Sequence, residues 1–461
     1  MDLNRRQLLL GAAAAAVPAF GAKKPVPLRP NIVMVVANDL AAWMLGCYGN
    51  QEIKTPNIDI LARSGMRFIN SFAVTPISSA SRATLFTGRT PRQTGIYDFL
   101  TDTPIEKPPQ GQKDVPASFA NEVMVSDILA KTGYNCGYIG KWHMGHDEQP
   151  GHGFRYTYTL GGGTSAGYQN PTMYLNGKAV NEDGYSTELM TKRATEFIDQ
   201  QSTSKPFFLT IGYQNPHTPY SGHPQKYYDL YAKTKFDSIG YDTPAGNALR
   251  EKDMLKDIVG NIRKCAAATT ALDDQIPVLL KRLQDRGFRD NTLFVFTSDN
   301  GYLLGRHGLW SKGLASDPPN LYEEVMQVPM LWSWPGRIPA ESAVPDLVSH
   351  YDFVPTVCDI VDTDVPERKL CGRSYLPLAF RQKLPKKEPW PTTVFGEFRN
   401  TFMARDRRYK IVVRNDAKGP NEMYDVVADP REKVNQYNNP QFITVRDRLL
   451  GQLQDWKSRT A

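Results

Sequence analysis

The chain has 461 residues, of which 41% are hydrophobic and 22% are charged, and its formal net charge is +7. This is an ordinary globular composition, with enough apolar material for one large domain and a smaller appendage. The positive excess suits an anionic substrate, but it forms no basic-aromatic tract of the kind that binds nucleic acid, so no nucleic-acid partner is expected.

The first residues predict an export signal over residues 1–22. Arg5 and Arg6 precede an apolar run over residues 8–16, and small residues follow it. The paired arginines resemble the twin-arginine type of signal, which is read by export machinery that carries folded chains. The run is too short to span a bilayer. We therefore expect a periplasmic or extracellular protein with no stable membrane span; the alternative for this segment is a buried N-terminal helix.

The five cysteines show no spacing typical of a metal site. Their odd number leaves at least one thiol unpaired in a monomer. A bridge between Cys358 and Cys371 is conceivable, but buried free thiols are the favoured interpretation.

Apolar runs alternate with helical patterns from residue 31 to about 380, which predicts an α/β domain with a mainly parallel sheet. Thr55 and Pro56 mark the start of the first helix, and Gly65 follows its end. The expected strands are residues 32–37, 134–139, 207–213, 293–298 and 328–332, and further helices are expected around residues 125–129 and over 266–286.

A proline-rich, charged segment at residues 381–393 predicts a linker between a catalytic domain (26–380) and a C-terminal subdomain (381–461). Residues 393–397 and 409–413 resemble strands of a small antiparallel sheet. Leu449, Leu453 and Trp456 lie on one face of a closing helix. The segments 98–117 and 161–176 are predicted to be long loops, which are usually functional or disordered.

Polar clusters follow four of the predicted strands directly. Ligands of open α/β sheets bind at the carboxyl ends of strands, so these side chains are expected at one edge of the sheet. Any one cluster alone is explained equally well by helix capping or by a turn. The clusters are Asn38-Asp39, Lys141 with His143, His217, and Asp299-Asn300.

The strongest signal is the segment Ser78-Ser79-Ala80-Ser81-Arg82-Ala83-Thr84-Leu85-Phe86-Thr87-Gly88-Arg89. It resembles the signature of the sulfatase family, in which a Cys or Ser, any residue, and Pro or Ala lead to Ser-Arg and later Leu-x-Thr-Gly-Arg. The likeness covers about residues 30 to 440. Other matching motifs, in the family's order, are Pro30-Asn31-Ile32-Val33, Thr55-Pro56-Asn57, Gly140-Lys141-Trp142-His143, Pro216-His217-Thr218-Pro219, Ser298-Asp299-Asn300-Gly301, His307-Gly308, Lys312 and Met423-Tyr424-Asp425.

The resemblance implies an alkaline-phosphatase-like fold, with a large mixed sheet between helices and a C-terminal antiparallel sheet plus helix. It also implies that Ser78 is oxidised to formylglycine by a maturation enzyme of the radical type. The hydrated aldehyde then offers one hydroxyl to attack sulfur and a second whose deprotonation expels sulfate, whereas an ordinary serine is a weak nucleophile.

The family's other roles carry over to matching positions. Arg82 orients the hydrated aldehyde, and Lys141 and Lys312 hold the sulfate oxygens. His217 protonates the leaving alcohol, His143 takes the second hydroxyl's proton, and Asp299 acts as base for the attacking hydroxyl. The implied ligands of one calcium ion are Asn38, Asp39, Ser78, Asp299 and Asn300. Asn38 departs from the pattern, because the family usually has two adjacent aspartates there.

Substrate contacts are also predicted for Arg306, His307 and Arg399. By resemblance, the expected substrate is a sulfated carbohydrate. Two alternatives stay open: a phosphatase or phosphonate-ester hydrolase of the same superfamily, and a non-catalytic protein that binds sulfated glycans.

Overall fold

The computed structural model describes residues 29–100, 115–161, 167–382, 384 and 389–461. The predicted export signal therefore lies outside the described residues, as does most of the loop predicted at 98–117. Within the described part of the chain, no helix combines the length and the apolar character that crossing a membrane requires. All five cysteines have free thiols.

A ten-stranded mixed sheet forms the centre of the large domain, in the order β10-β2-β9-β8-β1-β7-β3-β4-β5-β6. Its five central strands β8, β1, β7, β3 and β4 are parallel to one another. The bounds are β1 Asn31–Asn38, β2 Met66–Phe72, β3 Asn135–Gly140, β4 Tyr156–Leu160, β5 Thr172–Leu175, β6 Lys178–Asn181, β7 Phe207–Pro216, β8 Thr292–Ser298, β9 Met330–Ser333 and β10 Ser342–Ser349.

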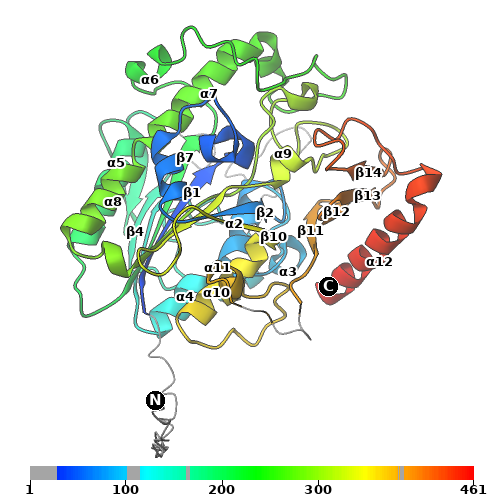
Figure 1. The fold of residues 1–461 in the computed structure, drawn as a ribbon. Helices are drawn as coiled ribbons and strands as arrows, with labels where there is room; N and C mark the ends of the chain where they lie inside the picture. Colours follow the sequence, from blue (N-terminus) through cyan, green and yellow to red (C-terminus); the bar gives the residue numbers. More distant parts are fainter. Residues whose placement is uncertain (1–28, 101–114, 162–166, 383, 385–388) are drawn as a thin grey trace, which may run out of the picture.

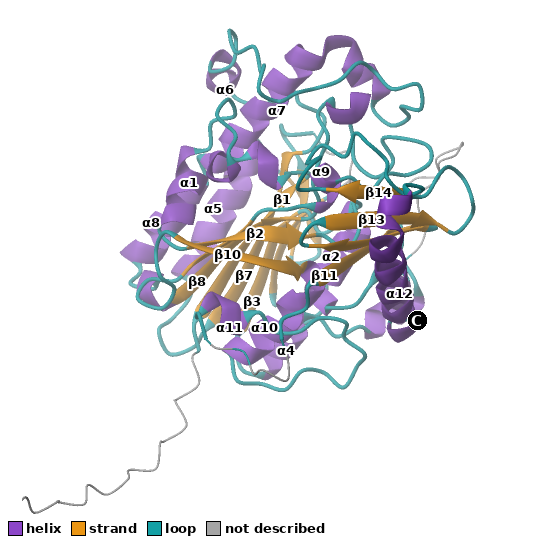
Figure 2. Ribbon diagram, turned by 45° about the vertical axis from the view of Figure 1, so that its right-hand side comes forward, coloured by secondary structure: helices purple, strands orange, loops and turns teal. Residues whose placement is uncertain are grey.

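Helices cover both faces of this sheet (Figures 1 and 2). β1 is apolar up to Ala37 because it is buried on both sides: Val33 and Val35 pack in one core cluster, and Ile32 and Met34 pack in the other. On one face lie α1 Pro56–Arg63, α5 Ser186–Asp199, α7 Ile258–Asp273 and α8 Ile276–Asp285; on the other lie α2 Ser78–Thr87, α4 Val125–Lys131, α10 Phe353–Ile360 and α11 Leu376–Ala379.

Two predicted elements differ from the structure. The helix expected over 266–286 is two helices, because Pro277 lacks an N–H and favours the first turn of a new helix. At the break, the carboxylate of Asp273 accepts the backbone N–H groups of Asn57 and Ile58 at 3.1 and 2.7 Å and so caps α1. The loop expected at 161–176 contains β5.

The C-terminal subdomain is a separate four-stranded antiparallel sheet with a long helix beside it (Figure 1). One face packs on the helix through Phe395 and Trp456, whose rings stack at 5.3 Å, and the other face packs against Phe72 and Ile77 of the large domain. The expected strands are present, and two unpredicted strands accompany them. The bounds are β11 Thr393–Phe398, β12 Thr401–Asp406, β13 Tyr409–Arg414, β14 Glu422–Asp425 and α12 Ile443–Arg459; the short helices are α3 Pro91–Thr94, α6 Gln225–Asp229 and α9 Glu323–Met326.

The predicted fold class is therefore confirmed: a large, mainly parallel mixed sheet between helices, with a small antiparallel sheet and helix at the C-terminus. The domain boundary at residue 381 remains a prediction.

Removal of the Trp456 ring is expected to destabilise the subdomain. Trp456→Ala leaves a cavity against Phe395, and such truncations cost about 3–5 kcal/mol of unfolding free energy. Guanidinium denaturation followed by circular dichroism measures this, with the exposed neighbour Asp455→Ala as control. Equal midpoints for the two variants would contradict the packing role.

Candidate active site

Ser78 is the first residue of α2 and its side chain is buried. Its hydroxyl oxygen lies 3.2 Å from Oδ1 of Asn38 and 3.3 Å from Oδ1 of Asn300, and the Lys312 ammonium donates to it from 2.9 Å. The start of a helix also carries the positive end of the helix dipole. Ile77, not Ser78, is the N-cap, so Ser78 is not explained as a capping serine.

The pairing of β1 with β8 brings the two predicted ligand pairs side by side. Ala37 lies opposite Ser298 in the parallel register, so both chains leave the sheet at the same edge. The backbone N–H of Asp39 donates to Oδ1 of Asp299 at 3.0 Å, and Nδ2 of Asn300 donates to Oδ1 of Asp39 at 2.8 Å. The strand-end clusters around Ser78 thus form one buried group.

Arg82 lies one turn after Ser78 on α2 and joins this group to β3 and the turn that follows it. Its Nε is 3.0 Å from Oδ2 of Asp299, with both side chains fully buried. Nη1 donates to the backbone oxygen of Lys141 at 2.7 Å and to the Tyr138 hydroxyl at 3.3 Å. Nη2 is buried without a partner among the described residues. A donor left in this state costs about 1–3 kcal/mol, which favours binding of a further acceptor.

β3 ends in a turn that only glycine fits. Gly140 has φ of 95°, and a Cβ there would lie 2.1 Å from the backbone oxygen of Gly212. The same oxygen accepts the Lys141 N–H at 2.7 Å. This close approach directs Lys141 and His143 from β3 toward the cluster.

His143 is a neutral ring with one free nitrogen. Nε2 lies 3.2 Å from the backbone oxygen of Leu100, which can only accept, so Nε2 carries the proton. Nδ1 is buried and has no partner in the described part of the chain. Burial and the nearby charges of Lys141 and Arg82 lower the pKa of His143 well below its ordinary value. Its Nδ1 lone pair is therefore available to accept a proton.

Electrostatics keep the Asp299 carboxylate charged and lower the pKa of one lysine. Burial alone would raise the pKa of Asp299, but Arg82, Lys312 and Lys141 outweigh it and hold that pKa well below its usual range. Burial and the charge of Arg82 lower the pKa of Lys141 to about 7. The site therefore contains an ionised carboxylate and a lysine whose pKa a bound anion would raise, because an opposite charge nearby stabilises the ammonium form.

His217 follows β7 and faces the same cluster. Its Nδ1 contacts the backbone oxygen of Thr218, and its Nε2 is 3.7 Å from Oδ2 of Asp39. Burial and the charge of Lys141 lower the pKa of His217 to about 4. The ring is thus neutral near pH 7 when no anion is bound.

The oxygens around Ser78 fit a hard cation. In one orientation of the Asn38 amide, its oxygen lies 3.0 Å from Oδ2 of Asp299, an oxygen–oxygen contact that a shared cation makes favourable. In the other orientation its NH₂ donates to Asp299, and its oxygen accepts from Lys141 at 2.9 Å. The set depends on amide oxygens, because the described residues hold no group of three or more His, Cys, Asp or Glu side chains suited to a metal. Lys312 supplies a positive charge here, with its ammonium against Asp39 and Asn300.

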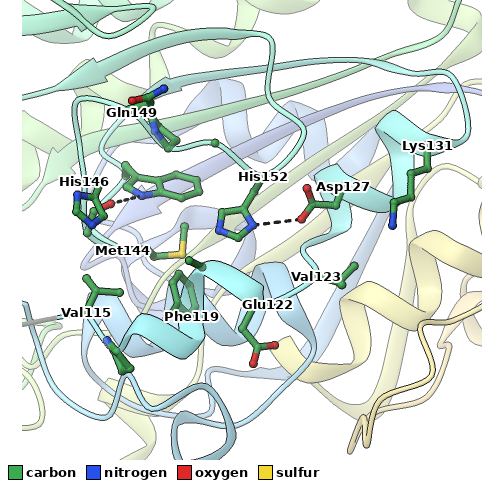
Figure 3. Close-up of a pocket in the computed structure, with 16 residues that line it drawn as sticks. Val115, Phe119, Glu122, Val123, Asp127, Lys131, Met144, His146, Gln149 and His152 are labelled. Atoms are coloured by element: carbon green, nitrogen blue, oxygen red, sulfur yellow. Dashed lines mark hydrogen bonds and ion pairs between the residues drawn. The ribbon is translucent and has the colours of Figure 1, made fainter.

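A cavity of about 270 Å³ opens onto Ser78. Besides predicted site residues, its wall contains six others: Ile77, Phe99, Thr218, Arg250, Glu251 and Ser311. Thr218 lies in a predicted motif and Phe99 in the loop predicted at 98–117, whereas sequence reasoning assigned no role to the other four. A larger cavity of about 520 Å³ lies beside α4 (Figure 3) and contains a hydrogen bond of 3.2 Å between His152 and Asp127. It lacks Ser78 and the charged cluster, so its size alone does not make it the site.

Three predicted substrate contacts lie elsewhere among the described residues. His307 stacks on Tyr322 at 3.7 Å, and its Nε2 is 3.2 Å from Glu324. Arg306 lies over the Trp43 ring and 3.5 Å from Glu324. Arg399 pairs with Asp98 at 2.7 Å. None of the three lines the described wall of the Ser78 cavity, so their role in substrate binding stays a prediction.

The chain matches known proteins along nearly its whole length. The family model described as Sulfatase matches residues 30–363, and the model described as N-sulphoglucosamine sulphohydrolase, C-terminal, matches residues 305–459. An N-acetylglucosamine-6-O-sulfatase of Bacteroides thetaiotaomicron is 25% identical, over 99% of this chain and 91% of the relative. An ulvan-active sulfatase of Formosa agariphila is 27% identical, over 93% and 81%.

Solved structures agree with the fold. One, of a protein in complex with its substrate D-glucosamine-2-N,6-O-disulfate, has a TM-score of 0.79 and 24% identity, and the match covers 94% of this chain and 98% of that one. At this identity the likeness supports the fold and not the substrate.

The Glu324 cluster yields a stability prediction. Burial opposes the charge of Glu324, but His307 and Arg306 outweigh it and lower its pKa from 4.5 to about 2. A depressed carboxylate pKa stabilises the folded state above about pH 4.5, by about 3 kcal/mol, and this is lost as the pH falls through about 2. Glu324→Gln should therefore unfold more easily than the wild type at pH 7, with the difference shrinking in acid.

Chemical denaturation at several pH values measures this difference. Asp237→Asn, at an exposed carboxylate with no ion pair among the described residues, is the control. A pH-independent difference would contradict the assignment.

Proposed function

We propose that this protein, which belongs to the sulfatase family and is a sulfuric ester hydrolase, removes sulfate from sulfated glycans. The family model covers the segment from β1 through α10, which includes every residue of the buried cluster around Ser78. Glycan substrates are supported by the names of the relatives, an N-acetylglucosamine-6-O-sulfatase and an ulvan-active sulfatase. The observation that carries the proposal is the contact of Asn38, Asn300 and Lys312 with the buried hydroxyl of Ser78. Asp39, Asp299 and Arg82 are linked to these residues by hydrogen bonds and ion pairs.

The proposed nucleophile is a formylglycine made from Ser78. Two buried nitrogens near it, Nη2 of Arg82 and Nδ1 of His143, lack partners among the described residues. A side chain at position 78 with more than one oxygen suits such a pair, because one nitrogen donates and the other accepts. The hydrated aldehyde would supply one hydroxyl for attack on sulfur and a second for release of sulfate.

The remaining side chains have proposed roles that follow from their charges. Lys141 and Lys312 bind the sulfate oxygens, where negative charge grows in the transition state. The Asp299 carboxylate, which pairs with Arg82, is proposed to accept a proton from the attacking hydroxyl. His143 accepts the later proton at Nδ1.

His217 is proposed as the acid for the leaving alcohol. Its lowered pKa means that it must gain a proton before it can donate one. The negative charge of a bound sulfate favours that protonation, because an opposite charge nearby stabilises the imidazolium.

Calcium is the proposed metal, held by Asn38, Asp39, Asp299, Asn300 and the residue at position 78. Carboxylate and amide oxygens are the ligands that calcium prefers, and the ion would add positive charge beside the sulfate. The proposed partners are a sulfated carbohydrate, a radical-type maturation enzyme and the export machinery. The proposed location is periplasmic or extracellular.

The first test uses protein expressed with a maturation enzyme. The tryptic peptide with residue 78 should be lighter by two hydrogens and should react with aldehyde probes. Matured protein should release sulfate from members of a panel of sulfated mono- and oligosaccharides, and Ser78→Ala should lower the rate on the order of 10⁴-fold or more.

Ser64→Ala, at an exposed serine outside the site, is the matched control. Active enzyme with purely unmodified Ser78 would favour a phosphatase-like reaction. Full modification without turnover across the panel would favour a glycan-binding protein.

A second test concerns Asn38. Asn38→Asp restores a negative charge among the ligands and provides an oxygen toward Lys141, which lies 2.9 Å from the amide. Calcium should bind about tenfold more tightly, since ligand charge tunes calcium affinity. Isothermal titration calorimetry with calcium measures it, and unchanged affinity would mean that residue 38 is not a ligand.

A further inference from the structure

Arg250 lies in the wall of the Ser78 cavity, and its guanidinium forms no ion pair among the described residues. Its side chain is half-buried, and its guanidinium forms no hydrogen bond with any described residue. Other arginines near the cavity are paired: Arg82 with Asp299, and Arg399 with Asp98. A guanidinium has five N–H donors in a planar fork, so Arg250 has unused capacity to bind an anion.

The ring of Phe99 holds this guanidinium in place. The central carbon of Arg250 lies 4.2 Å from the ring centroid, within the range of cation–π attraction. Phe99 is buried and packs with Ile77 and Leu314, so the ring is a fixed support. An aromatic ring offers no oxygen acceptor, which leaves the hydrogen-bonding capacity of the guanidinium unsatisfied.

The backbone fixes Arg250 beside the segment that carries Lys312. The N–H of Leu249 donates to the oxygen of Ala315 at 2.8 Å, and that of Arg250 donates to the oxygen of Leu314 at 3.2 Å. Arg250 and Lys312 therefore lie on two hydrogen-bonded segments that line the same cavity. The Lys312 ammonium contacts Ser78, whereas the Arg250 guanidinium lies over the Phe99 ring, and its charge acts on the Asp98 carboxylate without forming an ion pair.

The nearest carboxylates are already engaged. Asp98 pairs with Arg399, and its backbone neighbour Phe99 donates to it at 2.8 Å. Glu251 has φ of 56°, and its side chain accepts from Thr218 at 2.7 Å and from the Tyr302 hydroxyl. Neither carboxylate lies within ion-pair distance of Arg250.

We propose that Arg250 binds a second anionic group of the substrate, a sulfate or a carboxylate near the ester that is hydrolysed. Phe99 acts as a positioning residue for this contact. The inference rests on the proposed function and narrows the substrate class to glycans with two neighbouring anionic groups. An arginine fork suits both sulfate and carboxylate oxygens, because each presents two acceptors.

The test compares matured wild type, Arg250→Ala and Arg250→Lys on three substrates: a monosulfated hexosamine, a disulfated hexosamine, and a sulfated hexosamine linked to a uronate. Arg250→Ala should reduce the preference in kcat/KM for a dianionic over the monosulfated substrate by about 10- to 100-fold, mainly through KM. Arg250→Lys should retain part of it. If the preference falls more for the disulfated substrate, the bound group is a sulfate. If it falls more for the substrate with the uronate, the group is a carboxylate.

The exposed neighbour Lys252→Ala is the charge-matched control and should keep the wild-type preference. Phe99→Leu should weaken the preference less than Arg250→Ala does. An unchanged preference in Arg250→Ala, or an equal loss on all three substrates, would overturn the proposal.

Failure of the proposed function gives a different result. In that case wild type releases sulfate from no sugar, and calorimetry on Ser78→Ala compares binding of the disulfated and monosulfated hexosamines with and without Arg250. Tighter binding of the disulfated sugar that depends on Arg250 supports the anion site, and equal binding overturns it.

Discussion

The buried ion pair between Arg82 and Asp299 is the interaction on which the site depends. It joins the first turns of α2 to the end of β8, and both side chains are inaccessible to solvent. Arg82 also holds the backbone of Lys141, so one guanidinium links a helix to two strands. Breaking such a pair leaves a buried charge uncompensated. The ion pair of Arg82 with Asp299 therefore also fixes the position of Ser78, four residues earlier on α2, relative to the edge of the sheet.

The cluster has more positive than negative charge. Arg82, Lys141 and Lys312 face the two carboxylates of Asp39 and Asp299, and residue 38 is a neutral amide. This surplus adds to the effect of burial, which is the main cause of the lowered pKa of Lys141, and it makes an anion a favourable occupant. It also opposes a divalent cation more than the family's usual pair of aspartates would. Under the proposed function, sulfate binding and metal binding would thus be balanced differently in this chain, with the anion favoured.

The sequence predicted those strands and site residues whose positions follow from the pattern of neighbouring residues along the chain. The apolar run of β1 and the polar pairs after β1 and β8 imply one shared edge, because parallel strands end together. Contacts between distant segments were not predictable. Arg306 and His307 are predicted substrate contacts, and their contact with Glu324 could not be foreseen because Glu324 comes from a different segment. Arg250 lies in no motif. The proposed role of Arg250 depends on the engagement of the nearby Asp98 and Glu251 carboxylates by other partners, which only the folded chain reveals.

The burial of Ser78 has a consequence for the biogenesis of this protein. Once α2 has docked, the side chain of residue 78 is buried at the bottom of the 270 Å³ cavity, with the Lys312 ammonium against it. A second enzyme cannot surround a side chain in that position. Under the proposed function, oxidation must therefore reach the segment while it is still extended, during or soon after synthesis. Folding then leaves the product accessible only through the cavity, and a chain that folds before oxidation would stay inactive.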